Sequence, residues 1–130
     1  MLKRICSFLF LIVFFSMGLQ AQAVLKADKT SHNFGKFTED TPVSCVFVFT
    51  NVGDEPLVIQ QAMSTCGCTV ANYTKTPIQP GEKGELHVTY NGKGKYPGHF
   101  KKSISVRSNA SNSLARFYIE GDMEESAQKK

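Results

Sequence analysis

Short stretches that alternate between apolar and polar residues are the feature that most limits how this chain can fold. Successive side chains of an extended strand point to opposite faces, so a period of two gives one buried and one exposed face. Residues 43–50 follow this pattern, and the predicted buried set is Val43, Cys45, Phe47 and Phe49. The alternation returns at Leu86–Tyr90, Ile104–Val106 and Ala115–Ile119. The chain is therefore expected to form several short strands that pack through one face.

Turn-forming residues separate these strands at intervals typical of two packed antiparallel sheets. Asn51–Asp54 ends the first strand, and Pro80-Gly81 has the residues favoured at the centre of a type II turn. Further strands are expected at Leu57–Met63, at Thr69–Tyr73 as an edge strand, and near Leu25 and Phe34. No stretch after residue 23 has a sustained 3.6-residue apolar period. The sequence predicts an all-β, immunoglobulin-like antiparallel β-sandwich of about seven strands.

The N-terminus contains the three parts of a secretory signal peptide. The positive pair Lys3-Arg4 precedes an apolar run from Ile5 to Met17, and Ala21-Gln22-Ala23 supplies the small residues of a cleavage site. The run is shorter than the roughly 20 residues that a membrane-spanning helix needs. We therefore predict a signal peptide over residues 1–23 and cleavage after Ala23. Export to the periplasm or cell exterior follows, without stable membrane insertion; an uncleaved anchor is the alternative.

Cleavage at that point leaves 107 of the 130 residues, the usual size of one domain. We expect residues 24–123 to form the sandwich and residues 124–130 a polar tail. Because Lys3 and Arg4 are lost, 13 basic residues face 11 acidic ones. This balance does not indicate nucleic acid as a partner, and leaves protein as the predicted class. The local basic residues are interpreted as solvated: Lys93, Lys95, Lys101 and Lys102.

Three cysteines remain after cleavage, because Cys6 lies in the signal peptide: Cys45, Cys66 and Cys68. In one interpretation Cys45 forms a disulfide with Cys66 or Cys68, closing a loop of some 20 residues worth about 3 kcal/mol in an oxidising compartment. In a second, all the thiols pack as small apolar side chains. In a third, Cys66-Gly67-Cys68 is a redox-active dithiol or supplies two thiolate ligands for a soft metal such as Cu(I). An odd number leaves one thiol over after any single disulfide.

No pattern in the sequence specifies catalysis. The serine nucleophile elbow, the His-Glu-x-x-His metal motif and the phosphate loop are all absent from it. Three adjacent carboxylate pairs are interpreted as solvated turns or tail: Glu39-Asp40, Asp54-Glu55 and Glu124-Glu125. The histidines are scattered and have no ligand spacing to the cysteine pair: His32, His87 and His99. We predict no catalytic residue, no cofactor and no metal site, with Cys66 and Cys68 the one alternative for a metal.

The order and spacing of several motifs resemble one bacterial family. Phe47–Gly53 followed by Pro56–Ile59 is similar to its F-x-F-x-N-x-G-x-x-P-L-x-I opening, and Pro77–Gly84 to its P-I-x-P-G-x-x-G turn. Ser64-Thr65-Cys66-Gly67-Cys68-Thr69 resembles its S-C-G-C-T signature, with a threonine added before the first cysteine. Ile119-Glu120-Gly121 fits its closing strand. Over about residues 32–123 the chain resembles domain-of-unknown-function family 1573.

This resemblance implies an exported immunoglobulin-like sandwich, similar in fold to Hydin-type and ASH domains, major sperm protein and periplasmic pilus chaperones. It implies no catalytic activity. The sequence therefore favours a non-enzymatic protein-binding or scaffold domain, with Val70 or the N-terminal segment on an edge strand that pairs with a partner. The alternative is a thiol-based function through Cys66-Gly67-Cys68, either soft-metal binding or dithiol redox chemistry. The oligomeric state does not follow from any of these patterns.

Overall fold

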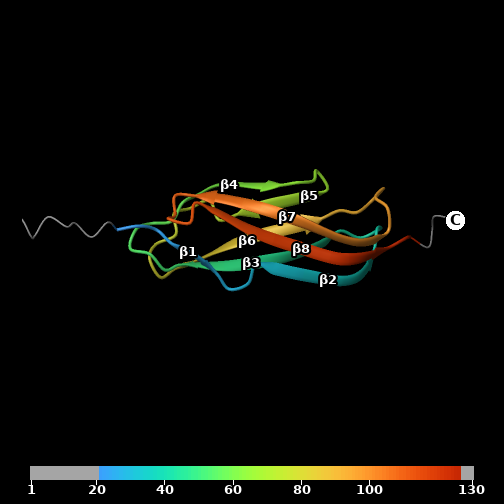
Figure 1. The fold of residues 1–130 in the computed structure, drawn as a ribbon, viewed down its shortest axis with the longest axis horizontal. Helices are drawn as coiled ribbons and strands as arrows, with labels where there is room; N and C mark the ends of the chain where they lie inside the picture. The colour runs from blue at the N-terminus through green and yellow to red at the C-terminus, as the bar shows by residue number, and fades with distance from the viewer. Residues whose placement is uncertain (1–20, 127–130) are drawn as a thin grey trace, which may run out of the picture.

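The computed structural model describes residues 21–126, so residues 1–20 of the predicted signal peptide lie outside the described part. All the elements named within it are strands: β1 (Leu25–Ala27), β2 (Ser31–Thr38), β3 (Val43–Asn51), β4 (Ile59–Ser64), β5 (Thr69–Tyr73), β6 (Lys83–Tyr90), β7 (Gly98–Ser108) and β8 (Leu114–Glu124). Figure 1 shows them as two layers whose strands run along the long axis of the molecule. Residues 21–126 contain no helix that could cross a membrane.

Each layer is a four-stranded sheet, in the order β1-β3-β6-β5 and β2-β8-β7-β4. The predicted all-β immunoglobulin-like sandwich is confirmed, with eight strands in the described part of the chain. One pairing differs from a purely antiparallel sandwich, since β2 runs parallel to β8 with Ser31 opposite Tyr118. The difference arises because β2 joins the second sheet instead of turning back beside β1. β4 and β5 are the edge strands on one side, each in a different sheet (Figure 1).

The alternating residues form the core as predicted. Phe47 and Phe49 on β3 are fully buried, and the ring of Phe47 lies 5.0 Å from that of Phe117 on β8. The other strands contribute the same alternate positions: Leu86, Val88, Ile104, Val106 and Ile119. Burial of these side chains stabilises the fold by roughly 1.5–3 kcal/mol each relative to exposure. The period of two therefore located the buried face of each central strand.

An aromatic cluster extends this core. The rings of Tyr90 and Phe100 stack 4.1 Å apart, and Phe37 meets both edge-on at 6.1 and 5.7 Å. Gly121 lies beneath the cluster, where an added Cβ would approach both the Phe37 and the Phe100 rings within 3.2 Å. The packing therefore joins β2, β6, β7 and β8, and it explains the glycine in the Ile119-Glu120-Gly121 motif.

The side chain of Asn51, at the end of β3, is fully buried and satisfies the backbone of three segments. Its Nδ2 donates to the carbonyl oxygens of Glu55 at 2.7 Å and Ile78 at 2.9 Å. Its Oδ1 accepts from the amides of Gly53 at 3.0 Å and Val24 at 3.3 Å. A buried amide with partners on all sides fixes the relative positions of these segments, because leaving any of them unpaired would be costly.

The segment before β1 packs into the same junction. The Gln22 carbonyl accepts from the amide of Asp54 at 2.8 Å, and the Ala23 carbonyl accepts from that of Ser111 at 2.9 Å. The Ala23 side chain belongs to the core, and a Cβ on Gly53 would collide with the backbone of residues 22–24. Cleavage after Ala23 stays a prediction, but it would remove residues that this structure packs into the sandwich.

The turn before β6 has the predicted conformation. Gly81 has a φ of +84°, and the amide of Glu82 donates to the carbonyl of Gln79 at 2.9 Å, as in a type II turn centred on Pro80-Gly81. Three residues later, Gly84 lies against the Phe49 ring and Ile78, where an added Cβ would come within 2.8 Å of both. The structure therefore explains both glycines of the Pro77–Gly84 motif, Gly81 by its positive φ and Gly84 by the lack of room for a side chain.

One residue of the three carboxylate pairs is buried, although its neighbour Asp40 is exposed as predicted. Glu39 is only 4% exposed, and its two oxygens accept from the amides of Gly94 at 3.3 Å and Ser126 at 3.4 Å. The interpretation of Glu39 as solvated was wrong because the β6–β7 loop and the C-terminal segment, both distant in sequence, cover it. β8 also continues to Glu124, and Ser126 is buried, within the range predicted as a polar tail.

Replacing Asn51 with alanine is expected to lower the free energy of unfolding by about 3 kcal/mol, since it removes two donors from buried carbonyls and two acceptors from amides. Asn72→Ala, which alters an exposed asparagine on β5, is the control and should change it by less than about 0.5 kcal/mol. Urea unfolding followed by circular dichroism measures both. Equal midpoints for the two variants would contradict the role given to Asn51.

A version of the domain that begins at Gln22 is expected to be more stable than one that begins at Val24, by about 1.5 kcal/mol. The shorter version lacks the two carbonyl acceptors and the buried Ala23 side chain. Urea midpoints of the two measure this, and a version that begins at Ala21 should match the Gln22 version. The intact mass of the exported protein gives the cleavage site itself. Identical stability of all three would show that residues 22 and 23 do not contribute.

Candidate functional site

The turn between β4 and β5 contains the one chemically distinctive group in the described residues, a disulfide between Cys66 and Cys68. The sulfurs are bonded across a single residue, Gly67, with the two Cα atoms 5.2 Å apart. Both cysteines are half-buried and Gly67 is exposed. The turn lies at the end of the sandwich where the β6–β7 loop also lies (Figure 1). We call this region the disulfide end, defined by Cys66, Cys68, Val70, Asn91, Lys93 and Lys95.

The predicted disulfide from Cys45 to Cys66 or Cys68 is not the one in the structure, where Cys45 is free. The reason is the strand order. Cys45 on β3 lies opposite Val88 on β6, and β5 pairs on the far side of β6. Neighbouring strands are about 4.8 Å apart, so β3 and β5 are separated by nearly 10 Å, beyond the Cα separation that a disulfide spans.

Cys45 instead points toward the core as one of the half-buried side chains packed against it. Burial raises the pKa of its thiol to about 11, an effect that the charge of Lys29 partly opposes. A thiol with this pKa is protonated at neutral pH and is a poor nucleophile. The interpretation of packed cysteines therefore describes Cys45 but not the other two.

Local hydrogen bonds hold the disulfide turn in place. The Ser64 hydroxyl donates to the Cys66 carbonyl at 2.8 Å and accepts from the Cys66 amide at 3.1 Å. The amide of Cys68 donates to Cys66 Sγ at 3.3 Å, and Thr69 closes the turn by donating its amide to the Cys66 carbonyl at 3.1 Å. The Ser64 side chain therefore explains the serine that precedes the cysteines in this motif.

A disulfide this short does little to stabilise the fold. In the chain-entropy model, a closed loop of three residues contributes about 1.6 kcal/mol, against about 3 kcal/mol for the predicted loop from Cys45. The hydrogen bonds of Ser64 and Thr69 already define the turn without the sulfurs. Its position on an exposed turn therefore suits chemistry or recognition better than a structural role.

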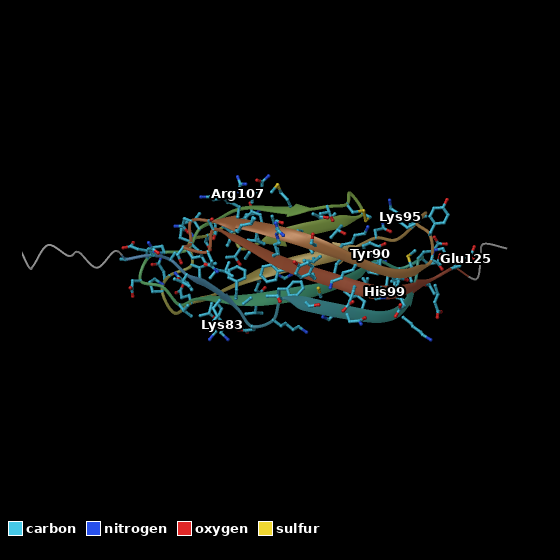
Figure 2. All side chains as sticks on the ribbon, viewed as in Figure 1. Lys83, Tyr90, Lys95, His99, Arg107 and Glu125 are labelled. Atoms are coloured by element: carbon cyan, nitrogen blue, oxygen red, sulfur yellow. A yellow bond between two sulfur atoms is a disulfide. The ribbon has the colours of Figure 1, made fainter. Side chains whose placement is uncertain are left out.

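A hollow of about 390 Å³ adjoins the disulfide and is lined by Gly67, Cys68, Val70, Asn91, Lys93 and Lys95. Val70 is 66% exposed, an unusual fraction for a valine in a strand. Tyr96, next to Lys95, is 97% exposed at the tip of the β6–β7 loop; Figure 2 shows Lys95 at this end of the molecule. Lys93 and Lys95 are exposed to solvent, as the sequence predicts. Their position beside Cys68 was not predicted, because the loop that carries them has no regular sequence pattern.

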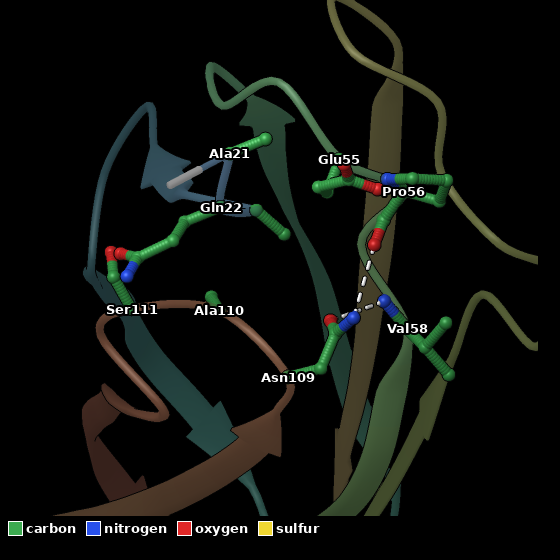
Figure 3. Close-up of a pocket in the computed structure, with 9 residues that line it drawn as sticks. Ala21, Gln22, Glu55, Pro56, Val58, Asn109, Ala110 and Ser111 are labelled. Atoms are coloured by element: carbon green, nitrogen blue, oxygen red, sulfur yellow. Dashed lines mark hydrogen bonds between the residues drawn. The ribbon is translucent and has the colours of Figure 1, made fainter. Parts of the chain in front are cut away.

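A second hollow, of about 540 Å³, is shown in Figure 3. It lies beside the N-terminal segment, at the end of the sandwich opposite the disulfide (Figure 1). Asn109 forms one wall, where its Oδ1 accepts from the Val58 amide at 2.8 Å and its Nδ2 donates to the Pro56 carbonyl at 3.0 Å. Ala21, Gln22 and Ala23 form another. The predicted cleavage after Ala23 would remove these three residues and with them one wall of the hollow.

The histidines lie apart from the disulfide. His99 Nδ1 is 3.0 Å from Asp122 and its Nε2 3.5 Å from Glu120, while His87 is 2.8 Å from Glu85, all on partly exposed surface. Within residues 21–126 no group of three or more histidine, cysteine or acidic side chains is arranged to bind a metal. Bonded to each other, the Cys66 and Cys68 sulfurs are also not the thiolates that a soft metal would need.

The fold places the chain among the immunoglobulin-like sandwiches, and it is similar in fold to ASH and PapD-like domains. The described chain superposes on the ASH/PapD-like domain 7 of human CEP192 with a TM-score of 0.65 at 11% identity, covering 81% of this chain and 88% of that one. It is similar to the periplasmic chaperone SfaE, with a TM-score of 0.57 at 12% identity, over 77% of this chain and 58% of the chaperone.

The particular family follows from the sequence match. The family described as protein of unknown function (DUF1573) matches residues 25–123, and the chain belongs to this family. A protein of unknown function from Porphyromonas gingivalis W83 is similar in structure, with a TM-score of 0.69 at 20% identity over 83% of this chain. The match spans half of that bacterial chain. A comparison with curated protein sequences gave no match.

The half-buried Cys45 thiol is expected to lower the free energy of unfolding in alkaline solution. Its pKa rises from 9.0 to about 11 on folding. Between these two pH values the thiol ionises in the unfolded chain but not in the folded one. The free energy of unfolding is therefore unaffected by the thiol below pH 9 and falls as the pH rises from 9 toward 11. Solvent screening of a half-buried thiol reduces the full value to about 1 kcal/mol.

Urea unfolding of the native chain and of Cys45→Ala at pH 8 and pH 10.5 measures this effect. The native chain should lose about 1 kcal/mol more than Cys45→Ala between the two pH values, because the variant lacks the titrating thiol. The same loss in both chains would contradict the account of Cys45.

Proposed function

We propose that this chain is an exported binding domain, which holds an extended segment of another protein along β5, at the disulfide end. The observation that carries the proposal is an edge strand with an exposed apolar side chain beside a basic hollow. β5 pairs only with β6, and Val70 on it is 66% exposed. An edge strand offers its free backbone groups to a partner strand, and its side chains set the specificity.

The backbone pattern identifies which part of β5 is available. The amide of Thr74 donates to the Glu85 carbonyl, and the Cys68 carbonyl accepts from the Asn91 amide, so alternate residues from 68 to 74 face β6. The residues between them face the free edge. Tyr73 at that edge is occupied, because its amide bonds to the Asn72 side chain and its hydroxyl to the Gln60 carbonyl. The available stretch is therefore centred on Ala71, next to the disulfide.

The surroundings of this stretch favour a partner segment with apolar and acidic residues. Val70 offers an apolar contact, while Lys93 and Lys95 line the hollow beside it. Tyr96, almost fully exposed, is of the residue type that often anchors protein interfaces. Opposite charges on the partner would guide its approach and fix its register.

Two further observations support an exported binding domain. The structures similar to this one include a periplasmic chaperone, and the N-terminal sequence has the pattern of a signal peptide. The His87–Glu85 and His99–Asp122 pairs are solvent-exposed side-chain contacts outside the hollow. These contacts suit surface electrostatics better than acid–base catalysis, which needs a substrate-sized site around the pair.

Photo-crosslinking in cells tests the edge directly. A photoreactive residue at Val70 is expected to give discrete covalent adducts with one or a few proteins, identified by mass spectrometry. The control is the same residue at Val46, an exposed valine on the outer face of the central strand β3. Equal adducts from both positions, or none from Val70, would contradict binding along β5.

Charge reversal provides a second test with a matched control. Lys93→Glu with Lys95→Glu should reduce the yield of Val70 adducts at least about fivefold, since two attractive charges become repulsive. Lys26→Glu with Lys83→Glu changes the net charge equally at the opposite end of the same sheet and should leave the yield unchanged. Equal losses from both pairs would mean that only net charge matters.

A further inference from the structure

We propose that the Cys66–Cys68 disulfide is a thiol–disulfide exchange site, which oxidises a pair of cysteine thiols on an exported polypeptide. The activity goes beyond the binding function and does not depend on it. It rests on three features of the turn: open access to the sulfurs, positive charge beside one of them, and a hydrogen-bond donor at the other.

Access is the first feature. The disulfide is half-buried in an exposed turn and not between the two sheets, where structural disulfides of sandwich domains lie. An added Cβ on Gly67 would meet nothing within 4 Å, so the turn is open on that side. The hollow lined by Cys68 and Val70 gives a thiol-bearing segment room to approach.

Charge is the second feature, and it distinguishes the two sulfurs. Lys93 and Lys95 line the hollow together with Cys68, but Cys66 does not line it. The attacking species in exchange is a thiolate, which two ammonium groups attract and stabilise. A thiolate that these lysines attract into the hollow would therefore meet Cys68 and not Cys66.

The third feature is the fate of the leaving sulfur. The amide of Cys68 donates to Cys66 Sγ at 3.3 Å. When the disulfide breaks, the negative charge develops on Cys66 Sγ, and a hydrogen bond to a charged acceptor is stronger than one to a neutral acceptor. The backbone thus stabilises Cys66 as the leaving group, and a leaving thiolate of lower pKa departs faster.

The exchange balances without a further reactant. A substrate thiolate attacks Cys68 Sγ, a mixed disulfide forms, and the bond between Cys66 and Cys68 breaks to leave a Cys66 thiolate. The second substrate thiolate then attacks the substrate sulfur of the mixed disulfide and releases the Cys68 thiolate. Two electrons pass from the substrate dithiol to the cysteine pair, and the thiolates take up the protons that the substrate released. A small disulfide such as oxidised glutathione restores the pair by the reverse exchange.

Cys45 has no part in this chemistry. It is on the other side of β6 from β5, and it packs against the core. The reaction therefore uses two of the three cysteines and leaves the third as an internal control for nonspecific thiol chemistry.

The test uses the exported protein and a synthetic peptide with two reduced cysteines. After incubation and acid quenching, alkylation and mass spectrometry count the free thiols of both molecules. The expected result is one peptide disulfide for each protein that gains two alkylated cysteines, mapped to Cys66 and Cys68, with the circular dichroism spectrum unchanged. A reduced peptide that stays reduced, or a protein that unfolds as the pair is reduced, would overturn the proposal.

Trapping the mixed disulfide tests the direction of attack. The native protein is incubated briefly with reduced glutathione, quenched in acid and alkylated, and mass spectrometry maps the cysteine that is bonded to glutathione. Attack on Cys68 Sγ should place at least about fivefold more glutathione on Cys68 than on Cys66. Equal amounts on both, or more on Cys66, would overturn the assignment of Cys68 as the attacked sulfur.

The lysines and Cys45 complete the test. Lys93→Glu with Lys95→Glu should slow reduction of the disulfide by glutathione at least about threefold, whereas Lys26→Glu with Lys83→Glu should not change it. Cys45→Ala should exchange at the native rate. Unchanged rates in the first pair, or loss of exchange in Cys45→Ala, would contradict the site.

Discussion

The buried amide of Asn51 is the interaction on which the arrangement of this sandwich depends. It connects the end of β3 to the segment before β1 through the Val24 amide, and to the turn that follows β3 through the Gly53 amide and the Glu55 carbonyl. The carbonyl of Ile78 connects it to the loop before β6. The backbone of Asn51 also bonds to that loop, through Glu82 and Gly81. Such a residue satisfies backbone groups that no strand ladder reaches, so the loops at this end are fixed as firmly as the sheets.

The other end of the molecule carries the candidate site. At this disulfide end, the β4–β5 turn holds the cysteine pair, and the β6–β7 loop beside it carries the exposed Tyr96 and the two lysines. Recognition and chemistry are commonly located on loops that a rigid scaffold positions. A binding edge next to an exchangeable disulfide would bring an extended, thiol-bearing segment into place, so the two proposals describe compatible uses of one surface.

Local sequence predicted most of the fold and little of the site. The alternation in residues 43–50 identified the buried face of β3, and Pro80-Gly81 identified a type II turn, because both depend on neighbouring residues only. Local sequence could not predict that Cys45 stays unbonded to Cys66 and Cys68, because this depends on the strand order, in which β6 lies between β3 and β5. Local sequence also predicts a solvated Glu39, because the two amides that bond to its carboxylate, those of Gly94 and Ser126, are far away in sequence. The lysines beside Cys68 belong to a glycine-rich loop that no periodicity describes.

The central claim is that buried packing and the Asn51 contacts maintain this fold, while the Cys66–Cys68 disulfide is free to be exchanged. Hydrogen exchange of backbone amides, measured by mass spectrometry on the oxidised and the reduced protein, tests it most directly. The account predicts the same protection across β3, β6, β7 and β8 in both forms, with faster exchange after reduction only around residues 64–70. Loss of protection throughout both sheets on reduction would contradict it.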